Sequence, residues 1–567
     1  MITVGLNACI VDENGHIRGV DGGGVCVFRD EEILFAITEE RLSYKKYDGG
    51  FRYSLPYALE ACSLTMSDVD QFVVSYYGVS LEVPDLVIDE IKGRLKLQDY
   101  QKFIVIPSHH LSHAYISFFT SGYKRALVVI NDNEGQIIGP KVSSNMFENA
   151  CERNSYYLAE GDTLTLLDRD FDYPNALGFG KVYNKITRYL GLGNYHNAGK
   201  TMGLTSYGSG SLLNIGDIYE EDYDGNLHCI VPDTGDTEKD IQAMFSKLGA
   251  SIPMARQAKD PLRQIHADMA EYVQHQLEKW TIHRVRRLLK ENGLTHVCVG
   301  GGVALNCLTN SLLLNLPEVS GVYVPPAPHD QGLCIGNALY GITEQMKEEG
   351  RKVSADFKFP LYLGKQFDIT EVKLFEILEH YPNLRLYKLN NAVEEAAKLI
   401  ASGNVIAWYQ GRSEFGPRAL GNRSILADPR DKLVINRLNL EIKKREAFRP
   451  FAPSVLLEKM EDYFEGFSGE SPSMMFTAMV RPEKKALLSA ITHVDGTARL
   501  QTVTKESNPK YHRLIETFGE MTGIYVLVDT SFNLDGMPIV ESPSDAVQCF
   551  SKSSLDALII GDYIIRK

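Results

Sequence analysis

Hydrophobic positions in the N-terminal part of the chain follow two spacings. Short runs rich in Val, Ile and Phe predict β-strands, whereas the amphipathic stretches 267–292 and 330–349 predict helices. Strands and helices that alternate in this way are typical of a layered α/β domain. The predicted strands cover residues 2–6, 25–28, 33–37, 103–106, 126–130, 296–299 and 322–324.

The same pattern indicates where the chain turns and where it divides. Charged residues at 29–32, between two predicted strands, indicate a hairpin turn. The charged and weakly patterned stretch 344–358 predicts a linker, with the boundary near residue 355. We therefore expect an α/β protein with domains at 1–354 and 355–567. The strands predicted in the second domain are 405–408, 524–528 and 557–560.

Composition narrows the class of protein. The chain has 567 residues, enough for two or three domains, and its 44% hydrophobic content is ordinary for a globular protein. A formal net charge of −14 argues against a broad nucleic-acid-binding surface. The nine cysteines are scattered without a C-x-x-C pair, which indicates reduced thiols. Because no signal peptide and no long apolar run is evident, we expect a cytoplasmic protein with no membrane partner.

Positive charge is concentrated in residues 408–454, within an otherwise acidic chain. Glycines and prolines recur there, and arginines held on rigid turns present planar forks to a phosphate or carboxylate. The segment therefore predicts a pocket for a small anion, and the alternative is a solvated basic surface. Its basic residues are Arg412, Arg418, Arg423, Arg430, Lys432, Arg437, Lys443, Lys444, Arg445 and Arg449.

A histidine-rich segment follows the predicted strand 103–106. A helix capped by Ser108 would place His109 and His113 one turn apart on the same face, where both imidazoles reach one metal ion. The best third ligand is Asp330, which follows a strand and opens a helix. Two nitrogens and one carboxylate oxygen suit Fe(II), Mn(II) or Zn(II). The alternative is that backbone or solvent satisfies the histidines.

Three glycine-bearing turns lie after or near strands. They are residues 132–135, 197–204 and 299–306, and the second of them carries Lys200. Backbone N–H groups at such turns bind phosphate, as in nucleotide-binding α/β folds. For the glycine triplet at 300–302, close packing is an equally good interpretation.

These segments, together with GPRALGNRSIL at 416–426 and REAFRPFAPS at 445–454, resemble the NodU/CmcH-type O-carbamoyltransferases of nodulation-factor and antibiotic biosynthesis. The matching motifs run in family order across nearly the whole chain. The other motifs are TEERLSYKK, HHLSHA, NAGKTMGLTSYG, GGGVALN, HDQGLCIGNAL, THVDGTARLQ and DTSFNLDGMPIVESP.

The resemblance implies a TsaD-like (ASKHA) nucleotide- and metal-binding domain at 1–354 and a YrdC-like domain at 355–567. In such enzymes ATP and carbamoyl phosphate form carbamoyl-adenylate in the YrdC-like domain. The other domain transfers the carbamoyl group to a hydroxyl. The resemblance assigns the metal, usually Fe(II), to His109, His113 and Asp330. It assigns the adenylate to Asp132, Gly135, Lys200, Gly301, Gly302 and Asn306.

Charge chemistry suggests which residues hold carbamoyl phosphate, a dianion with a poor electrophilic carbon. Arg418, Lys443 and Arg449 are expected to neutralise the charge that develops on transfer, and Arg499 to reach the same pocket. At least one residue of 443–445 is expected on an exposed face. We expect Ser531 and Asn533 to add hydrogen bonds, Asp330 to act in catalysis as well as in metal binding, and Mg(II) to accompany ATP.

One position departs from the family pattern. The family's N-terminal histidine corresponds here to Val20, and His16 lies four residues earlier. Either His16 substitutes through a rearranged loop, or this contact is missing.

The expected function is ATP-dependent O-carbamoylation of a sugar, aminocyclitol, polyketide or peptide natural product. Loops at 139–172 and 208–260 are expected to shape the acceptor pocket, and homodimerisation stays open. One alternative is a threonylcarbamoyl-type enzyme that modifies tRNA, although the acidic balance does not favour a tRNA partner. The other alternative is a catalytically silent scaffold, which only the missing histidine supports.

Overall fold

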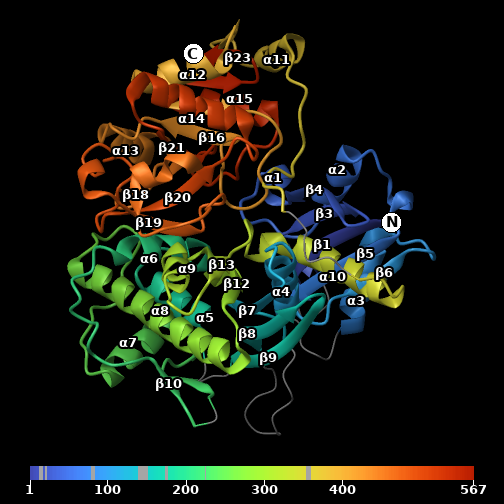
Figure 1. The fold of residues 1–567 in the computed structure, drawn as a ribbon, viewed down its shortest axis with the longest axis vertical. Helices are drawn as coiled ribbons and strands as arrows, with labels where there is room; N and C mark the ends of the chain where they lie inside the picture. The colour runs from blue at the N-terminus through green and yellow to red at the C-terminus, as the bar shows by residue number, and fades with distance from the viewer. Residues whose placement is uncertain are drawn as a thin grey trace. The chain divides into compact units, whose positions relative to one another are not determined.

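In the computed structural model, contacts divide the chain into two units. The first unit is Met1–Glu39 with Asp48–Phe359, and the second is Glu40–Tyr47 with Pro360–Lys567 (Figure 1). The sequence placed the division near residue 355 and did not anticipate that an N-terminal segment joins the second unit. The structure describes residues 1–11, 17–18, 22–77, 84–137, 151–172, 177–223, 225–352 and 359–567, so that His16 and Val20 lie outside it.

The first unit contains a six-stranded sheet in the order β4-β3-β1-β5-β6, with β2 paired to β1. Strand β1 runs antiparallel to β3 and parallel to β5, and the turn between β3 and β4 has a left-handed residue, Asp30, at φ 53°. This hairpin and the predicted strands are confirmed, whereas β2 and β5 were missed. The strands are β1 (Ile2–Val11), β2 (Ile17–Arg18), β3 (Gly24–Arg29), β4 (Glu32–Thr38), β5 (Gln71–Tyr77) and β6 (Lys102–Val105).

A second sheet of the first unit has the order β13-β12-β7-β8-β9. Strand β12 runs parallel to both β7 and β13, so the carboxyl ends of β7 and β12 lie at one edge. Strands β8 and β9 form an antiparallel hairpin inside the stretch 139–172, where the sequence predicted an acceptor loop. The strands are β7 (Arg125–Asn131), β8 (Cys151–Glu160), β9 (Thr163–Asp172), β12 (His296–Gly300) and β13 (Gly321–Tyr323).

Helices pack against these sheets and end where the sequence provides caps. Ser108 caps α4 (His109–Phe119) by accepting from the Leu111 N–H, as predicted. The long helix α8 (Gln264–Asn292) ends at Gly293, a left-handed residue at φ 59°. The other helices are α2 (Ser54–Ala61), α3 (Pro84–Leu95), α5 (Phe179–Tyr189), α6 (Ala198–Thr205), α7 (Thr237–Lys247), α9 (Cys307–Leu314) and α10 (Leu333–Glu348); β10 (Tyr219–Glu221) and β11 (Leu227–Cys229) form a small hairpin.

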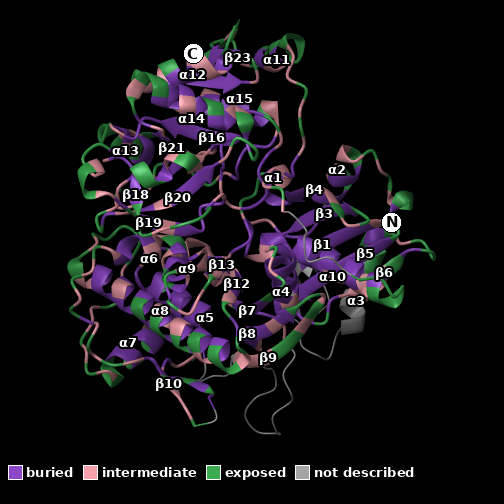
Figure 2. Ribbon diagram, in the orientation of Figure 1, coloured by how far each residue is buried: buried purple, intermediate pink, exposed green. Residues whose placement is uncertain are grey.

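The second unit is built on a ten-stranded mixed sheet in the order β14-β23-β22-β15-β16-β21-β17-β20-β19-β18. Its central strands are almost wholly buried (Figure 2). The three predicted strands correspond to β15 (Ile406–Tyr409), β21 (Val526–Ser531) and β22 (Ala557–Ile560). The remaining strands are β14 (Arg385–Lys388), β16 (Arg423–Ala427), β17 (Ala452–Leu456), β18 (Phe464–Glu465), β19 (Phe476–Val480), β20 (Thr497–Val503) and β23 (Tyr563–Arg566).

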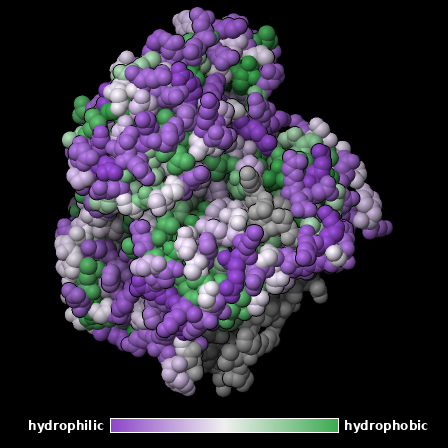
Figure 3. All heavy atoms as spheres, viewed as in Figure 1, coloured by the Kyte–Doolittle hydropathy of each residue, from purple (hydrophilic) through white to green (hydrophobic). Residues whose placement is uncertain are grey.

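Helices complete the second unit: α1 (Glu40–Ser43), α11 (Glu371–Leu378), α12 (Ala392–Ala401), α13 (Leu433–Asn436), α14 (Pro509–Thr522) and α15 (Pro543–Lys552). A π-helix, Arg437–Ile442, extends α13. Both units are therefore mixed α/β structures. Within the described ranges, no helix has the length and apolar character required to cross a bilayer. Hydrophilic side chains cover much of the face in Figure 3, with hydrophobic ones scattered among them.

Candidate metal centre and anion pocket

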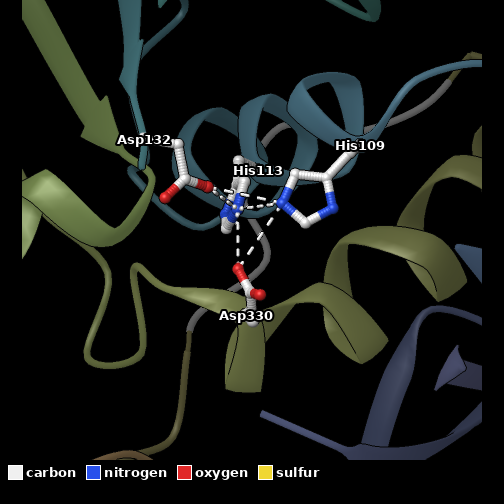
Figure 4. A group of neighbouring side chains, drawn as sticks. All are labelled: His109, His113, Asp132 and Asp330. Atoms are coloured by element: carbon white, nitrogen blue, oxygen red, sulfur yellow. Dashed lines mark hydrogen bonds and ion pairs between the residues drawn. The ribbon is translucent and has the colours of Figure 1, made fainter. Parts of the chain in front are cut away.

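Four side chains of the first unit converge on one point (Figure 4). His109 and His113 project from α4, Asp132 follows β7, and Asp330 opens the 3₁₀ turn that precedes α10. One ligand atom from each residue lies within 4.8 Å of the other three. The structure thus brings together His109, His113 and Asp330, which the sequence singled out, and adds Asp132.

The spacing of these atoms fits a bound metal ion. The two Nε2 atoms of the histidines are 3.2 Å apart. Asp132 Oδ2 lies 3.3 and 3.1 Å from them, and Asp330 Oδ1 lies 3.5 and 3.4 Å from them. Ligands that surround one ion at about 2.1 Å are separated from one another by about 3.0–3.5 Å. The four atoms therefore suit a site with two nitrogens and two carboxylate oxygens.

Charge also favours a cation at this point. Burial alone would lower the pKa of His109, but Asp330 and Asp132 overcome it and raise that pKa to about 10. Burial would raise the pKa of Asp330, and the two histidines instead lower it to about 2. One buried and one partly buried carboxylate next to two buried imidazoles need a compensating positive charge, which protons or a metal ion supply.

Asp132 lies beside the histidines of α4. The sequence predicted it in the nucleotide cradle, which stays a prediction, and its Oδ2 faces both histidines. Its Oδ1 accepts from the backbone N–H of Gly302 at 3.0 Å and of Asn133 at 2.8 Å. A single carboxylate thus links the candidate metal centre to the glycine turn after β12. Sequence spacing does not reveal this link, because it depends on the pairing of β7 with β12.

The glycine turn after β12 lets two backbone segments of the first unit approach each other closely. Gly301 has φ 85°, and a Cβ atom there would lie 2.2 Å from the Asn131 carbonyl oxygen. Asn306 caps α9 by accepting from the Thr309 N–H. Gly135 packs so closely that its Cβ would lie 2.7 Å from His110 Nε2. Lys200 lies on α6, which packs against α8.

Sequence reasoning missed Glu278, a partly buried residue of α8. Gln274 connects it to Asn306: the Gln274 amide donates to Glu278 Oε1 at 2.7 Å, and Asn306 donates to Gln274 Oε1 at 2.8 Å. Burial raises the pKa of Glu278 to about 7, although the hydrogen bond from Gln274 opposes the shift. Among many charges on a long helix, nothing in the sequence marks this carboxyl group.

Replacing Glu278 by glutamine is expected to remove a pH dependence of stability. The folded-state pKa is raised, so the stability contribution of the protonated group is complete below pH 4.5 and is lost as pH rises through about 7. Relative to the variant, the wild type should lose up to about 3 kcal/mol over this window. Urea unfolding at pH 4.5 and pH 8 measures the difference. Glu291→Gln, which changes an exposed residue of the same helix, is the control, and identical pH profiles for wild type and Glu278→Gln would contradict the prediction.

In the second unit, Lys443 follows the π-helix Arg437–Ile442, and its buried side chain reaches the end of β21. Its ammonium group donates to Ser531 O and to Asn533 Oδ1 and O, the latter two at 2.8 and 3.0 Å. Ser531 Oγ in turn donates to Asn533 Oδ1 at 2.7 Å. Three residues that the sequence proposed for one pocket therefore form one hydrogen-bonded group.

Positive side chains surround this group. Burial lowers the pKa of Lys443, and the charges of Arg445, Lys46 and Arg449 lower it further. Burial likewise lowers the pKa of Arg445, and the positive charges of Arg449 and Arg499 lower it further. We call Lys443, Arg445, Arg449 and Arg499 the cationic pocket. Lys444 is exposed, as expected of one residue in this run, and has a left-handed backbone at φ 45°.

Four other basic residues of the segment 408–454 have structural partners. Arg423 is buried, donates to the carbonyl groups of Gln410 and Glu541, and stacks on the Tyr409 ring at 3.7 Å. Arg418 lies half-buried in the loop between β15 and β16. The remaining partners are Leu363 and Gly364 for Arg412, Asp428 for Arg430, and Asp556 for Arg437. These four arginines therefore have partners within the protein, and an anion pocket stays a prediction for the other basic residues of the segment.

A buried metal-ligand group in one α/β unit and a cationic pocket in another are typical of an enzyme that handles anionic substrates. The chain belongs to the carbamoyltransferase family: residues 85–339 match the carbamoyltransferase N-terminus and residues 397–567 match the carbamoyltransferase C-terminus. The protein is accordingly a carbamoyltransferase.

Two nodulation proteins resemble the chain over most of its length, and an antibiotic-pathway enzyme resembles about half of it. The nodulation protein NolNO of Sinorhizobium fredii is 34% identical over 96% of this chain and 79% of its own. The nodulation protein NolO of Bradyrhizobium diazoefficiens is 36% identical over 81% of this chain and 79% of its own. The 3'-hydroxymethylcephem-O-carbamoyltransferase of Amycolatopsis lactamdurans is 36% identical over 47% of each chain.

Proposed function

We propose that the protein is an ATP-dependent O-carbamoyltransferase that uses carbamoyl phosphate, through carbamoyl-adenylate, to carbamoylate a hydroxyl group of a small molecule. The observation that carries this proposal is the cationic pocket, in which buried Lys443 is held by Ser531 and Asn533. A buried ammonium group next to partly exposed guanidinium groups is costly without a bound anion, and carbamoyl phosphate and ATP are such anions.

We assign adenylate formation to the second unit, as a YrdC-like domain. Carbamoyl phosphate, ATP and water give carbamoyl-adenylate, phosphate and pyrophosphate, so phosphate and pyrophosphate leave as anions. Lys443, Arg445, Arg449 and Arg499 neutralise the charge that builds on these groups. Arg418, which the sequence assigned to the same work, is kept in the proposal. Ser531 and Asn533 orient the Lys443 ammonium group toward the reacting phosphate.

We assign carbamoyl transfer to the first unit, as a TsaD-like (ASKHA) domain. His109, His113, Asp132 and Asp330 would hold a divalent metal ion, with Fe(II) the candidate that the family resemblance suggests. A bound divalent ion supplies Lewis-acid polarisation of an oxygen. The turn at Gly301 and Gly302, Gly135, Asn306 and Lys200 would hold the adenylate, and Asp132 fixes that turn relative to the histidines.

The acceptor in this proposal is a sugar, aminocyclitol, polyketide or peptide natural product with a free hydroxyl group. The 3'-hydroxymethylcephem-O-carbamoyltransferase of A. lactamdurans, as its name states, acts on a hydroxymethyl group. The relationship to this enzyme supports a small-molecule acceptor over tRNA.

Incubation of the iron-reconstituted protein with ATP and carbamoyl phosphate, without an acceptor, tests the first step. We expect carbamoyl-adenylate by mass spectrometry, with phosphate and pyrophosphate released in equal amounts. Omission of carbamoyl phosphate is the control and should abolish pyrophosphate release. Folded, metal-loaded protein that forms no adenylate under these conditions would contradict the proposed order of steps.

A further inference from the structure

A short segment of the N-terminal part of the chain, Glu40–Tyr47, belongs to the second unit. Arg41 anchors it: its guanidinium group lies 3.7 Å from the Glu541 carboxylate, with both side chains buried, and donates to the Gly416 carbonyl oxygen at 3.2 Å. The Tyr44 hydroxyl donates to Asp545 Oδ1 at 2.6 Å. None of the roles proposed above falls on this segment, although it contains most of the motif TEERLSYKK, which resembles the family.

The end of the segment has an unusual backbone. Tyr44 and Tyr47 have φ angles of 59° and 62°, in the left-handed region that residues with a bulky side chain avoid. The Tyr47 N–H donates to Glu40 Oε2 at 2.7 Å, which closes the loop. Backbone strain of this kind persists where surrounding contacts enforce it, and it is concentrated at functional sites. Lys45 and Lys46 lie between the two strained residues.

Lys46 acts electrostatically on the cationic pocket. Its charge is one of those that lower the pKa of buried Lys443, after burial itself and the charge of Arg445. The neighbouring Tyr47 interacts electrostatically with Arg449, another residue of the pocket. The Lys46 ammonium group is 5.0 Å from the centre of the Tyr47 ring, a distance at which the aromatic face favours the cation.

This arrangement adds a positive charge to a site that already holds several. Arg445 and Arg449 already oppose the charged form of Lys443, and a further ammonium group increases the repulsion. Two anchors and two strained residues hold the segment there despite this cost. An anion bound among these side chains would convert the repulsion into attraction.

We propose that Lys46 is a further anion-binding residue of the cationic pocket, and that Arg41 and Tyr44 are positioning residues that hold its segment in place. The identity of the anion rests on the proposed function. It is a phosphate group, either of carbamoyl phosphate or of the ATP triphosphate. Lys46 adds a compact ammonium group on a flexible side chain, which complements the planar guanidinium groups of the arginines.

Direct binding of simple anions tests this inference without any turnover. Inorganic phosphate and pyrophosphate are titrated calorimetrically into wild type, Lys46→Ala, Lys46→Arg and Lys45→Ala. We expect Lys46→Ala to weaken binding of at least one anion about tenfold, Lys46→Arg to recover part of the loss, and Lys45→Ala to stay within about twofold. Lys45→Ala removes the same charge one position earlier, so it controls for net charge. Equal affinities in wild type and Lys46→Ala, or no binding by the wild type, would overturn the proposal.

Steady-state kinetics then identify the source of the phosphate. A rise in the KM for carbamoyl phosphate in Lys46→Ala assigns Lys46 to that substrate, and a rise in the KM for ATP assigns it to the triphosphate. Tyr44→Phe should raise the same KM by a smaller factor at unchanged kcat, as a positioning role requires. If the wild type binds both anions through Lys46 but makes no adenylate, the proposed function fails while this inference stands.

Discussion

Replacing His113 by alanine is expected to remove the bound metal ion and to stop carbamoyl transfer to the acceptor. His113 Nε2 lies 3.2 Å from His109 Nε2, 3.1 Å from Asp132 Oδ2 and 3.4 Å from Asp330 Oδ1. Loss of a residue that supports a metal ligand only indirectly already costs 10- to 100-fold in metal affinity, so loss of a direct ligand should cost more than about 100-fold. Metal content after dialysis, measured by plasma mass spectrometry, provides the direct test.

His110 supplies a matched control on the same helix. It is equally buried, but its Nδ1 pairs with Ser155 Oγ at 2.8 Å and burial lowers its pKa to about 4. His110→Ala should lose stability and keep the metal. We expect the His113→Ala variant still to form carbamoyl-adenylate, because the cationic pocket uses none of the four metal-centre residues. Full metal content in the His113→Ala variant would refute the assignment, and loss of adenylate formation would show that the two steps are coupled.

Local patterns in the sequence predicted much of the fold and part of the candidate metal centre. Strand periodicity identified most strands of the first unit, and the Ser108 cap placed the start of α4. Helical spacing put His109 and His113 on one face, and a strand-to-helix turn pointed to Asp330. Each of these inferences depends on residues that are close in sequence, where local geometry decides the outcome.

The features that were missed depend on long-range packing. Asp132 reaches the histidines because β7 pairs with β12, and Glu278 acquires its raised pKa from burial, against the opposing hydrogen bond from Gln274. The segment Glu40–Tyr47 joins the second unit through contacts such as that of Arg41 with Glu541. Likewise, the sequence of the segment 408–454 shows how many basic residues it contains. It does not show that the Arg423 side chain donates to backbone carbonyl groups. Tertiary contacts of this kind leave no periodic signal in the sequence.

Replacing Lys443 by methionine is expected to abolish consumption of carbamoyl phosphate while the protein stays folded. Methionine keeps most of the aliphatic volume and removes the ammonium group that Ser531 and Asn533 hold. Preorganised charge at such a position contributes about 100- to 1,000-fold to the rate, so we expect a loss of at least this size in phosphate release. Burial and neighbouring cations already lower the pKa of Lys443, which means that the folded state disfavours its charge. Removal of that charge should therefore leave thermal stability unchanged or raise it.

Lys444→Met is the matched control for this experiment, because Lys444 is the adjacent residue and is exposed. It removes the same formal charge and should leave phosphate release within about twofold of wild type, since exposed charges contribute little. The two variants together separate a role of the cationic pocket from a general effect of net charge. Equal losses in both variants would refute a specific role for Lys443. Unfolding of Lys443→Met alone would show that its hydrogen bonds to Ser531 and Asn533 serve the fold, because the cost of burying the ammonium group would then be smaller than the stability these bonds provide.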